Sequence, residues 1–132
     1  MSDKELMALA IKARDRAYAP YSNFAVGAAL LTEGGKVYLG CNIENASFSP
    51  TNCAERTAIF SAIADGENKF SAIAICGGKI GAKRSFCTPC GVCRQVLSEF
   101  CGADLRVILE KEGGELKLLT LGDLLPFAFD IN

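Results

Sequence analysis

The sequence contains no histidine and no tryptophan among its 132 residues. Without an imidazole group, the serine–histidine and cysteine–histidine mechanisms of nucleophilic catalysis are excluded. A metal ion would have to be held by thiolates or carboxylates, because the most common nitrogen ligand is missing. Any group that moves protons near neutral pH must likewise be something other than imidazole. The absence of histidine therefore limits which side chains could bind a metal or transfer protons in this chain.

The sequence also lacks an excess of charge of either sign and a long apolar run. Its formal net charge is -1, with 14 basic and 15 acidic residues, so we predict no nucleic-acid partner. No apolar stretch approaches the roughly 20 residues that cross a membrane, and the first residues lack a basic-then-apolar signal segment. We therefore expect a cytoplasmic protein with no membrane contact, folded as one domain over residues 1–132.

Apolar residues recur at helical spacing in some stretches and form short strand-like runs in others, which is typical of an α/β domain. These patterns predict helices over about 3–17, 52–64, 89–101 and 121–125, and strands over about 24–31, 37–41, 70–76, 105–109 and 116–119. Pro89 suits the first position of the third helix, and the glycine-rich stretch 77–84 is interpreted as a loop. The order of elements predicts a five-stranded sheet with helices on its faces.

Cysteine is abundant, with seven residues and no export signal, so a disulfide framework is not expected. Cys53, Cys90 and Cys93 fall at the starts of two predicted helices. Unpaired N–H groups and the helix dipole favour the thiolate there, and Zn²⁺ binds thiolates. Cys90 and Cys93 lie one helical turn apart, so both sulfurs can reach one ion at about 2.3 Å. We predict one catalytic zinc ion per chain, held by these three residues with its fourth position open.

Other interpretations of the cysteines remain open. Cys87 also forms a C-x-x-C pair with Cys90, so a fourth thiolate would close the coordination shell of a structural zinc site. The same pair also fits a thioredoxin-like redox site. Cys41 and Cys76 fall in predicted strands and are interpreted as small core residues.

Glu55 and Arg56 follow Cys53 in the first turn of the predicted helix. We interpret Glu55 as the group that takes a proton from zinc-bound water and passes it to a leaving group. The alternative is a helix cap, because Asn52-x-x-Glu55 also fits a capping box. Arg56 is interpreted as a hydrogen-bond donor to the cysteine sulfurs, which would offset the negative charge of three thiolates. The alternative for Arg56 is an ordinary surface arginine.

Four stretches of the sequence together resemble the small homotetrameric cytidine deaminases that bind zinc through three cysteines. They are residues 24–30 (FAVGAAL), 40–47 (GCNIENAS), 53–58 (CAERTA) and 89–95 (PCGVCRQ). The two cysteine stretches specify the wider group of zinc deaminases, and the pattern Asn-x-Glu-Asn-Ala-Ser narrows the resemblance to cytidine deaminases. The resemblance implies the three-layer α-β-α fold of that family, with a mixed five-stranded sheet.

The same resemblance implies an activity: zinc-dependent hydrolysis of cytidine and 2′-deoxycytidine to uridine and 2′-deoxyuridine, with release of ammonia, in pyrimidine salvage. Cys53, Cys90 and Cys93 match the zinc ligands of the family, and Glu55 matches its proton shuttle. Glu55 would protonate the ring nitrogen N3 while C4 is attacked, and would then protonate the departing amine.

The resemblance also assigns residues to the substrate. Asn42 and Glu44 match the residues that hydrogen-bond the ribose 3′-hydroxyl. Phe24 matches the aromatic residue beside the nucleoside, and Ala54 matches a backbone contact to the base. Phe129 matches an aromatic residue that completes the site of a neighbouring chain, so the resemblance implies a homotetramer with shared sites.

Two positions depart from the family pattern, since Phe48 stands where tyrosine is frequent and Phe127 where glycine is usual.

Two rival functions also stay open. A deaminase of a related aminated nucleoside such as blasticidin would release ammonia from that antibiotic and not from cytidine. A non-catalytic structural zinc module would bind the metal and release no ammonia from any nucleoside.

Overall fold

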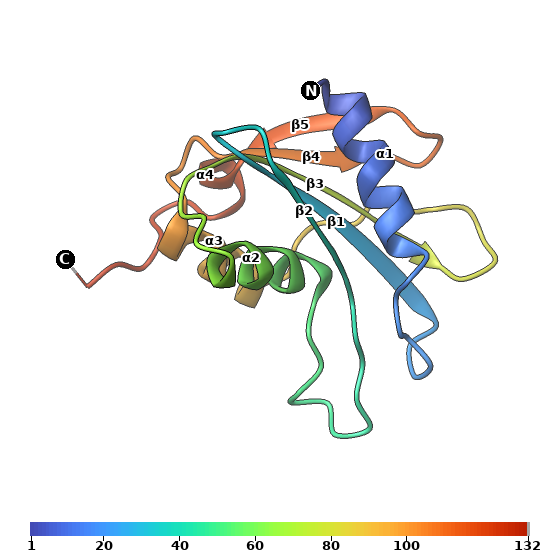
Figure 1. The fold of residues 1–132 in the computed structure, drawn as a ribbon. Coiled ribbons are helices and arrows are strands. Elements are labelled where there is room, and N and C mark those ends of the chain that lie inside the picture. The colour runs from blue at the N-terminus through green and yellow to red at the C-terminus, as the bar shows by residue number, and fades with distance from the viewer. Residues whose placement is uncertain (132) are drawn as a thin grey trace.

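Residues 1–131 are described by the computed structural model, in which one sheet has the strand order β2-β1-β3-β4-β5 (Figure 1). The elements in chain order are α1 (Asp3–Arg14), β1 (Phe24–Thr32), β2 (Val37–Cys41), α2 (Ala54–Ala64), β3 (Phe70–Lys79), α3 (Gly91–Phe100), β4 (Arg106–Glu110), β5 (Leu116–Thr120) and α4 (Leu121–Leu124). Among these residues, no helix has the length and apolar character needed to span a membrane.

The sheet is mixed. β1 pairs antiparallel with both β2 and β3, β3 pairs parallel with β4, and β4 pairs antiparallel with β5. α1 covers one face of the sheet, and α2 and α3 cover the other (Figure 1). This arrangement confirms the expected α/β architecture, a three-layer α-β-α fold with a five-stranded mixed sheet.

Two predicted element ends are wrong. α1 ends at Arg14 rather than near residue 17. β3 continues through Gly77 and Gly78 to Lys79, where the glycine content predicts a loop. These glycines allow the returning chain to lie against the strand, because a Cβ on Gly78 would stand 2.8 Å from the Cα of Arg84. Their small size therefore serves close packing here rather than flexibility.

The predicted start of α3 is also wrong by two residues. The helix begins at Gly91 with Cys90 as its N-cap, so Pro89 precedes the helix instead of opening it. The reason is the cysteine sulfur, which accepts a hydrogen bond from the backbone N–H of Cys93 at 3.3 Å. Cys90 thereby takes the position that a serine or aspartate side chain usually fills.

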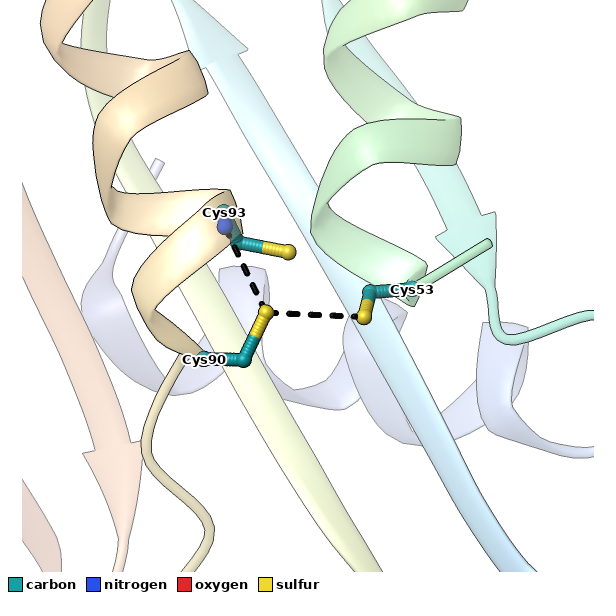
Figure 2. Close-up of side chains that lie close together, drawn as sticks. All are labelled: Cys53, Cys90 and Cys93. Carbon is teal, nitrogen blue, oxygen red and sulfur yellow. Dashed lines mark hydrogen bonds between the residues drawn. The ribbon is translucent and has the colours of Figure 1, made fainter. Parts of the chain in front are cut away.

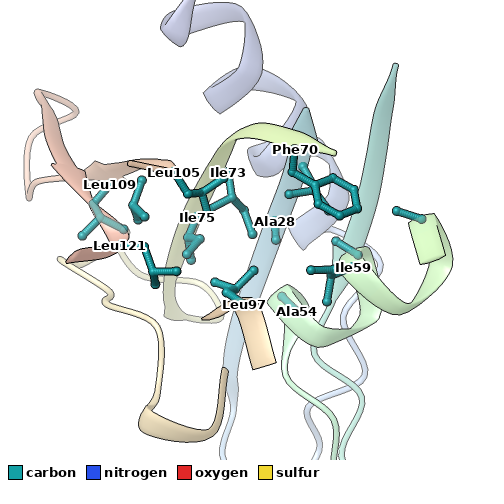
Figure 3. Close-up of a cluster of buried hydrophobic side chains, with 14 residues drawn as sticks. Ala28, Ala54, Ile59, Phe70, Ile73, Ile75, Leu97, Leu105, Leu109 and Leu121 are labelled. Atoms are coloured by element: carbon teal, nitrogen blue, oxygen red, sulfur yellow. The ribbon is translucent and has the colours of Figure 1, made fainter. Parts of the chain in front are cut away.

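Alternating side chains on the central strands divide the core into two layers. The layer beneath α2 and α3 is the larger and is shown in Figure 3. Its strand residues include Ala28, Leu30, Ile73, Ile75, Val107 and Leu109. The opposite layer joins Leu6, Met7 and Ala10 of α1 to Ala29, Ala72, Ala74, Cys76 and Ile108. Burial of each large side chain contributes about 1.5–3 kcal/mol, so both helix layers are held firmly on the sheet.

The two cysteine-bearing helices begin at the same edge of the sheet. β2 and β3 both run antiparallel to β1, so they point in the same direction. Gly27 of β1 pairs with Cys41 at the end of β2 and with Cys76 in β3, which places these two strands at the same level. α2 follows β2 and α3 follows β3, so both helix N-termini return to the edge where these strands end. Sheet topology therefore brings residues 53 and 90 together.

Gly40 in β2 lies directly beneath α2. A methyl group on its Cα would stand 2.3 Å from the backbone oxygen of Ala54 and 2.6 Å from the backbone nitrogen of Ala58. Because both atoms belong to the helix backbone, Gly40→Ala should displace α2 and lower the free energy of unfolding by about 3 kcal/mol. Urea titration measures this loss. Gly34→Ala is the matched control, because its nearest contact would be Thr32 Oγ1 at 3.8 Å. Equal losses in the two variants would contradict the close approach.

Candidate metal centre

Cys53, Cys90 and Cys93 lie together at the shared sheet edge (Figure 2). Cys53 is the N-cap of α2 and Cys90 the N-cap of α3, while Cys93 lies in the first turn of α3. Their sulfur atoms all lie within 4.8 Å of one another, and those of Cys53 and Cys90 are 3.7 Å apart. Two thiolates on one tetrahedral Zn²⁺, each at about 2.3 Å, would be about 3.8 Å apart. The sulfurs of Cys53 and Cys90 therefore have the spacing of two zinc ligands, and the sulfur of Cys93 lies close enough to bind the same ion.

The three cysteines differ in burial, which leaves the cluster open on one side. Cys93 is buried in the core, Cys53 is half-buried, and Cys90 is exposed. Three protein ligands with an accessible side match the catalytic type of zinc site, in which a fourth position takes water or substrate. A structural site would instead enclose the metal with four protein ligands.

Hydrogen bonds concentrate negative charge on Cys53. Its pKa falls to about 5, chiefly through the hydrogen bond with Cys93 and also through Arg56, although partial burial opposes the change. The pKa of Cys93 is raised, first by that same hydrogen bond and then by burial. Because zinc binds thiolates, metal binding would release the protons that these thiols still carry.

Cys87 is not a member of the cluster. It packs against Gly77, where a Cβ would stand 2.9 Å from the Cys87 sulfur and 3.0 Å from the ring of Phe24. Burial raises the pKa of the Cys87 thiol to about 12, so it stays protonated at neutral pH. The geometry thus favours three cysteine ligands over the closed four-cysteine alternative.

Glu55 lies beside the cluster and is not a helix cap. The N-cap of α2 is Cys53, so the capping-box position falls on Arg56, and the side chain of Asn52 donates to the hydroxyl of Thr57 instead. Glu55 is only 3% exposed. This burial raises the pKa of its carboxyl, and the charge on Cys53 raises it further. A buried carboxyl with a raised pKa is suited to proton exchange near neutral pH.

Arg56 contacts the cluster directly. Its Nη2 donates a hydrogen bond to the sulfur of Cys53 at 3.2 Å, and this interaction raises the pKa of the guanidinium. Its Nε is buried and has no hydrogen-bond partner within residues 1–131. Arg56 is therefore not an ordinary surface arginine, because its charge lies against a ligand sulfur.

Of the expected substrate residues, Phe24 begins β1, and Asn42 and Glu44 lie in the loop after β2. The side chain of Asn42 bridges the backbone of β1, where Nδ2 donates to the oxygen of Phe24 and Oδ1 accepts from the nitrogen of Val26, both at 2.8 Å. Asn42 and Phe24 are thus fixed to each other. Ala54 is the first residue of α2 and is fully buried, directly after Cys53.

Glu44 is held by residues that sequence reasoning does not identify. One carboxylate oxygen accepts from the backbone N–H groups of Tyr21 and Ser22 at 2.9 and 3.1 Å, and the other accepts from the Ser22 hydroxyl. The Ser22 hydroxyl is the main reason that the pKa of Glu44 is lowered. Glu44 also lines a cavity of about 340 Å³ together with Tyr21, Ser22, Phe48 and Thr51. Backbone donors leave no residue-type signal, which explains why the sequence does not reveal Tyr21.

Phe129 lies apart from the other expected site residues. It follows α4 on the C-terminal segment, where its backbone oxygen accepts from Gln95 Nε2 of α3 at 3.5 Å. Its side chain is 71% exposed. Within one chain, Phe129 is therefore not assembled with the substrate residues of β1 and the loop after β2.

A match to a protein-family model identifies the family of this chain. The model for the cytidine and deoxycytidylate deaminase zinc-binding region matches residues 1–109, which include both cysteine-bearing helix starts. The chain belongs to the cytidine deaminase family. The cysteine cluster accordingly lies in the zinc-binding region of a cytidine deaminase fold, and Zn²⁺ is its cofactor.

Cytidine deaminases resemble this chain over nearly its whole length. It is 49% identical to the cytidine deaminase of Sporosarcina psychrophila, over 98% of this chain and 92% of that protein. It is 47% identical to that of Halalkalibacterium halodurans, over 98% and 95%. The crystal structure of cytidine deaminase from Burkholderia pseudomallei superposes with a TM-score of 0.89 at 50% identity, covering 98% of this chain and all of that one. Sequence identity and structural superposition therefore indicate the same family and the same fold.

In this member of the cytidine deaminase family, Arg56→Ala should keep zinc and lose activity about 10–100-fold. Without the guanidinium, the three thiolates keep more of their charge, and the metal centre becomes a weaker acid. The acid limb of the pH–rate profile should then move to higher pH, because the active basic form appears only at higher pH. Arg16→Ala, which removes an exposed arginine, is the control. An unshifted acid limb with intact zinc would remove Arg56 from this role.

Proposed function

We propose that this chain catalyses the hydrolysis of cytidine and 2′-deoxycytidine to uridine and 2′-deoxyuridine, with release of ammonia, in pyrimidine salvage. The observation that carries the proposal is the buried carboxyl of Glu55 beside a three-cysteine cluster that is open on one side. Membership of the cytidine deaminase family supports the same reaction.

Cys53, Cys90 and Cys93 hold the metal in this proposal, and bound Zn²⁺ supplies an activated water for attack on the ring. Glu55 transfers the protons of the reaction. It accepts one proton from the attacking water and delivers it to the ring nitrogen N3. It then takes the second proton from the hydroxyl newly formed at C4 and passes it to the amine that leaves from C4. Oxygen from water thereby replaces nitrogen at C4, and ammonia departs. The raised pKa of Glu55 matches this exchange, because its carboxyl must both gain and lose a proton in each turnover.

The neighbouring residues orient the nucleoside. Asn42 uses one amide hydrogen and one lone pair for the β1 backbone, which leaves a second donor and a second acceptor site for a ribose hydroxyl. Glu44 is held by three donors from residues 21–22, and it lines the adjacent cavity. Phe24 offers an aromatic surface to the nucleoside, and the backbone of Ala54 contacts the base.

An assay with cytidine tests this proposal. Ultraviolet absorbance reports loss of the cytosine ring amine, and released ammonia is measured in the same sample. Cytidine and blasticidin are compared side by side at equal zinc content. Ammonia from blasticidin alone would favour the antibiotic deaminase, and bound zinc with no ammonia from either compound would favour the structural module.

We also propose that four chains assemble into a homotetramer in the cytoplasm, acting on a free nucleoside rather than on nucleic acid or at a membrane. The C-terminal segment supports assembly, because Phe127, Phe129 and Ile131 are exposed apolar residues on a single chain. Phe129 would complete the site of a neighbouring subunit, with Phe127 tolerated where glycine is usual. Free thiols on all seven cysteines suit a reducing compartment.

Mixing two defective chains should test the shared site. Glu55→Gln chains lack the proton shuttle and Phe129→Ala chains lack the neighbour's ring, so mixed assemblies regain some sites with both groups intact. We expect activity above the sum of the separate variants, with light scattering reporting four chains. An active monomer, or a mixture with no gain, would contradict the proposal.

A further inference from the structure

The segment that carries Cys90 is held by Arg94, a side chain that the proposed mechanism does not use. Arg94 lies in the first turns of α3. Its Nε donates to the backbone oxygen of Pro89 at 2.8 Å, and its Nη1 donates to the backbone oxygen of Leu124 at 2.6 Å. One guanidinium therefore joins the peptide before a zinc ligand to the end of α4.

The carbonyl of Pro89 requires such a donor because the nearby backbone N–H groups are used elsewhere. The N–H of Cys93 donates to the sulfur of Cys90 at 3.3 Å, and the N–H of Arg94 donates to the oxygen of Cys90 at 2.9 Å. Pro89 itself is fully buried. A buried carbonyl without a hydrogen bond is unfavourable, and the Arg94 side chain provides that bond.

Among the three ligands, Cys90 is the one whose sulfur position depends most on the backbone. Cys93 is buried and Cys53 is half-buried, so packing limits their movement, whereas Cys90 is exposed. The place of its sulfur is therefore set mainly by the orientation of the peptide that joins it to Pro89. We propose that Arg94 is a positioning residue of the zinc centre, which fixes this peptide and ties it to α4 through Leu124.

The two bonds explain why arginine occupies this position. The guanidinium is planar and presents several N–H donors at fixed angles, so it can reach two separate carbonyl oxygens at once. A lysine ammonium is a single point donor on a flexible stem and cannot reproduce that span. The inference depends on the zinc centre and not on which nucleoside is hydrolysed, so measurements on the metal test it even if the proposed substrate is wrong.

Zinc release from the loaded protein tests the inference. A chromophoric chelator traps the ion, and its colour gives the release rate for the wild type, Arg94→Met, Arg94→Lys and Arg106→Met. We expect Arg94→Met to release zinc about tenfold faster, as for other side chains that orient a metal ligand, and Arg94→Lys to show a smaller increase. Arg106→Met is the matched control, because Arg106 pairs with Asp3 on α1 and should leave the rate unchanged.

Cobalt substitution adds a spectroscopic measurement that a general loss of stability would not change. The Co²⁺ absorption bands report the geometry of the three thiolates, so a displaced Cys90 should alter them in Arg94→Met and not in Arg106→Met. Wild-type release rates and unchanged cobalt spectra in the Arg94 variants would overturn the proposal. If Arg94→Met does not fold, the lysine variant decides, and a wild-type release rate there has the same meaning.

Discussion

Replacing Glu55 by glutamine is expected to lower the turnover of cytidine by about 10³–10⁴-fold while zinc and fold are retained. General acid–base groups contribute about 10²–10⁴-fold, and Glu55 acts in more than one proton transfer of the proposed reaction. Glutamine has nearly the same shape, so the buried position beside Cys53 stays filled. The variant removes only the ability to take up and release a proton.

Three measurements on purified protein distinguish the possible results of this substitution. Turnover is followed by absorbance, zinc by metal analysis and fold by circular dichroism, with Glu99→Gln as the control for a change on the exposed side of α3. Near-normal turnover in Glu55→Gln would assign the reaction's proton transfers to another group. Loss of zinc together with activity would instead show that Glu55 supports the metal site.

Replacing Cys90 by alanine is expected to remove both zinc and activity, whereas Cys87→Ala should retain both. Cys90 supplies one of three sulfurs with zinc-compatible spacing, and two remaining thiolates are too few for a protein zinc site. Cys87 lies outside the cluster, and its high pKa keeps it protonated. The two substitutions therefore form a matched pair, because each removes one thiol from the same C-x-x-C pattern.

Metal analysis after dialysis gives the zinc content of each variant. Comparing Cys90→Ala with Cys87→Ala then distinguishes the open three-cysteine site from the closed four-cysteine site. Equal loss of zinc in both would restore the closed four-cysteine site and the structural function that goes with it. Retention in Cys87→Ala alone would support an open catalytic position. Cys53→Ala and Cys93→Ala are expected to behave like Cys90→Ala, since each supplies one of the clustered sulfurs.

The zinc cluster could be predicted from sequence because its signals are local. A cysteine at a helix start needs only the helix to be recognised, and the C-x-x-C spacing fixes two sulfurs on one turn. The meeting of Cys53 with this pair depends on topology, but the parallel direction of β2 and β3 follows from the antiparallel pairing of each with β1.

Other features could not be predicted because their cause lies in distant contacts. The extension of β3 through Gly77 depends on Cys87 and the returning chain, which pack where a side chain would otherwise be. Arg94 carries no sequence signal for its role, since an arginine on a helix usually indicates a solvent-facing position. Its two acceptors are backbone carbonyls, one of them 30 residues away, and the identity of those residues says nothing about the bond.

The convergence of both cysteine helices on one sheet edge has a kinetic consequence. Cys53 follows the β1–β2 hairpin, whereas Cys90 and Cys93 follow β3, which joins the sheet through long-range pairing with β1. We therefore expect the sulfurs to meet only after the three strands have assembled, late in folding. An ion that binds so late stabilises the native state more than the transition state, so it slows unfolding and hardly changes the rate of folding. We therefore expect bound zinc to lengthen the lifetime of the folded chain without speeding its formation.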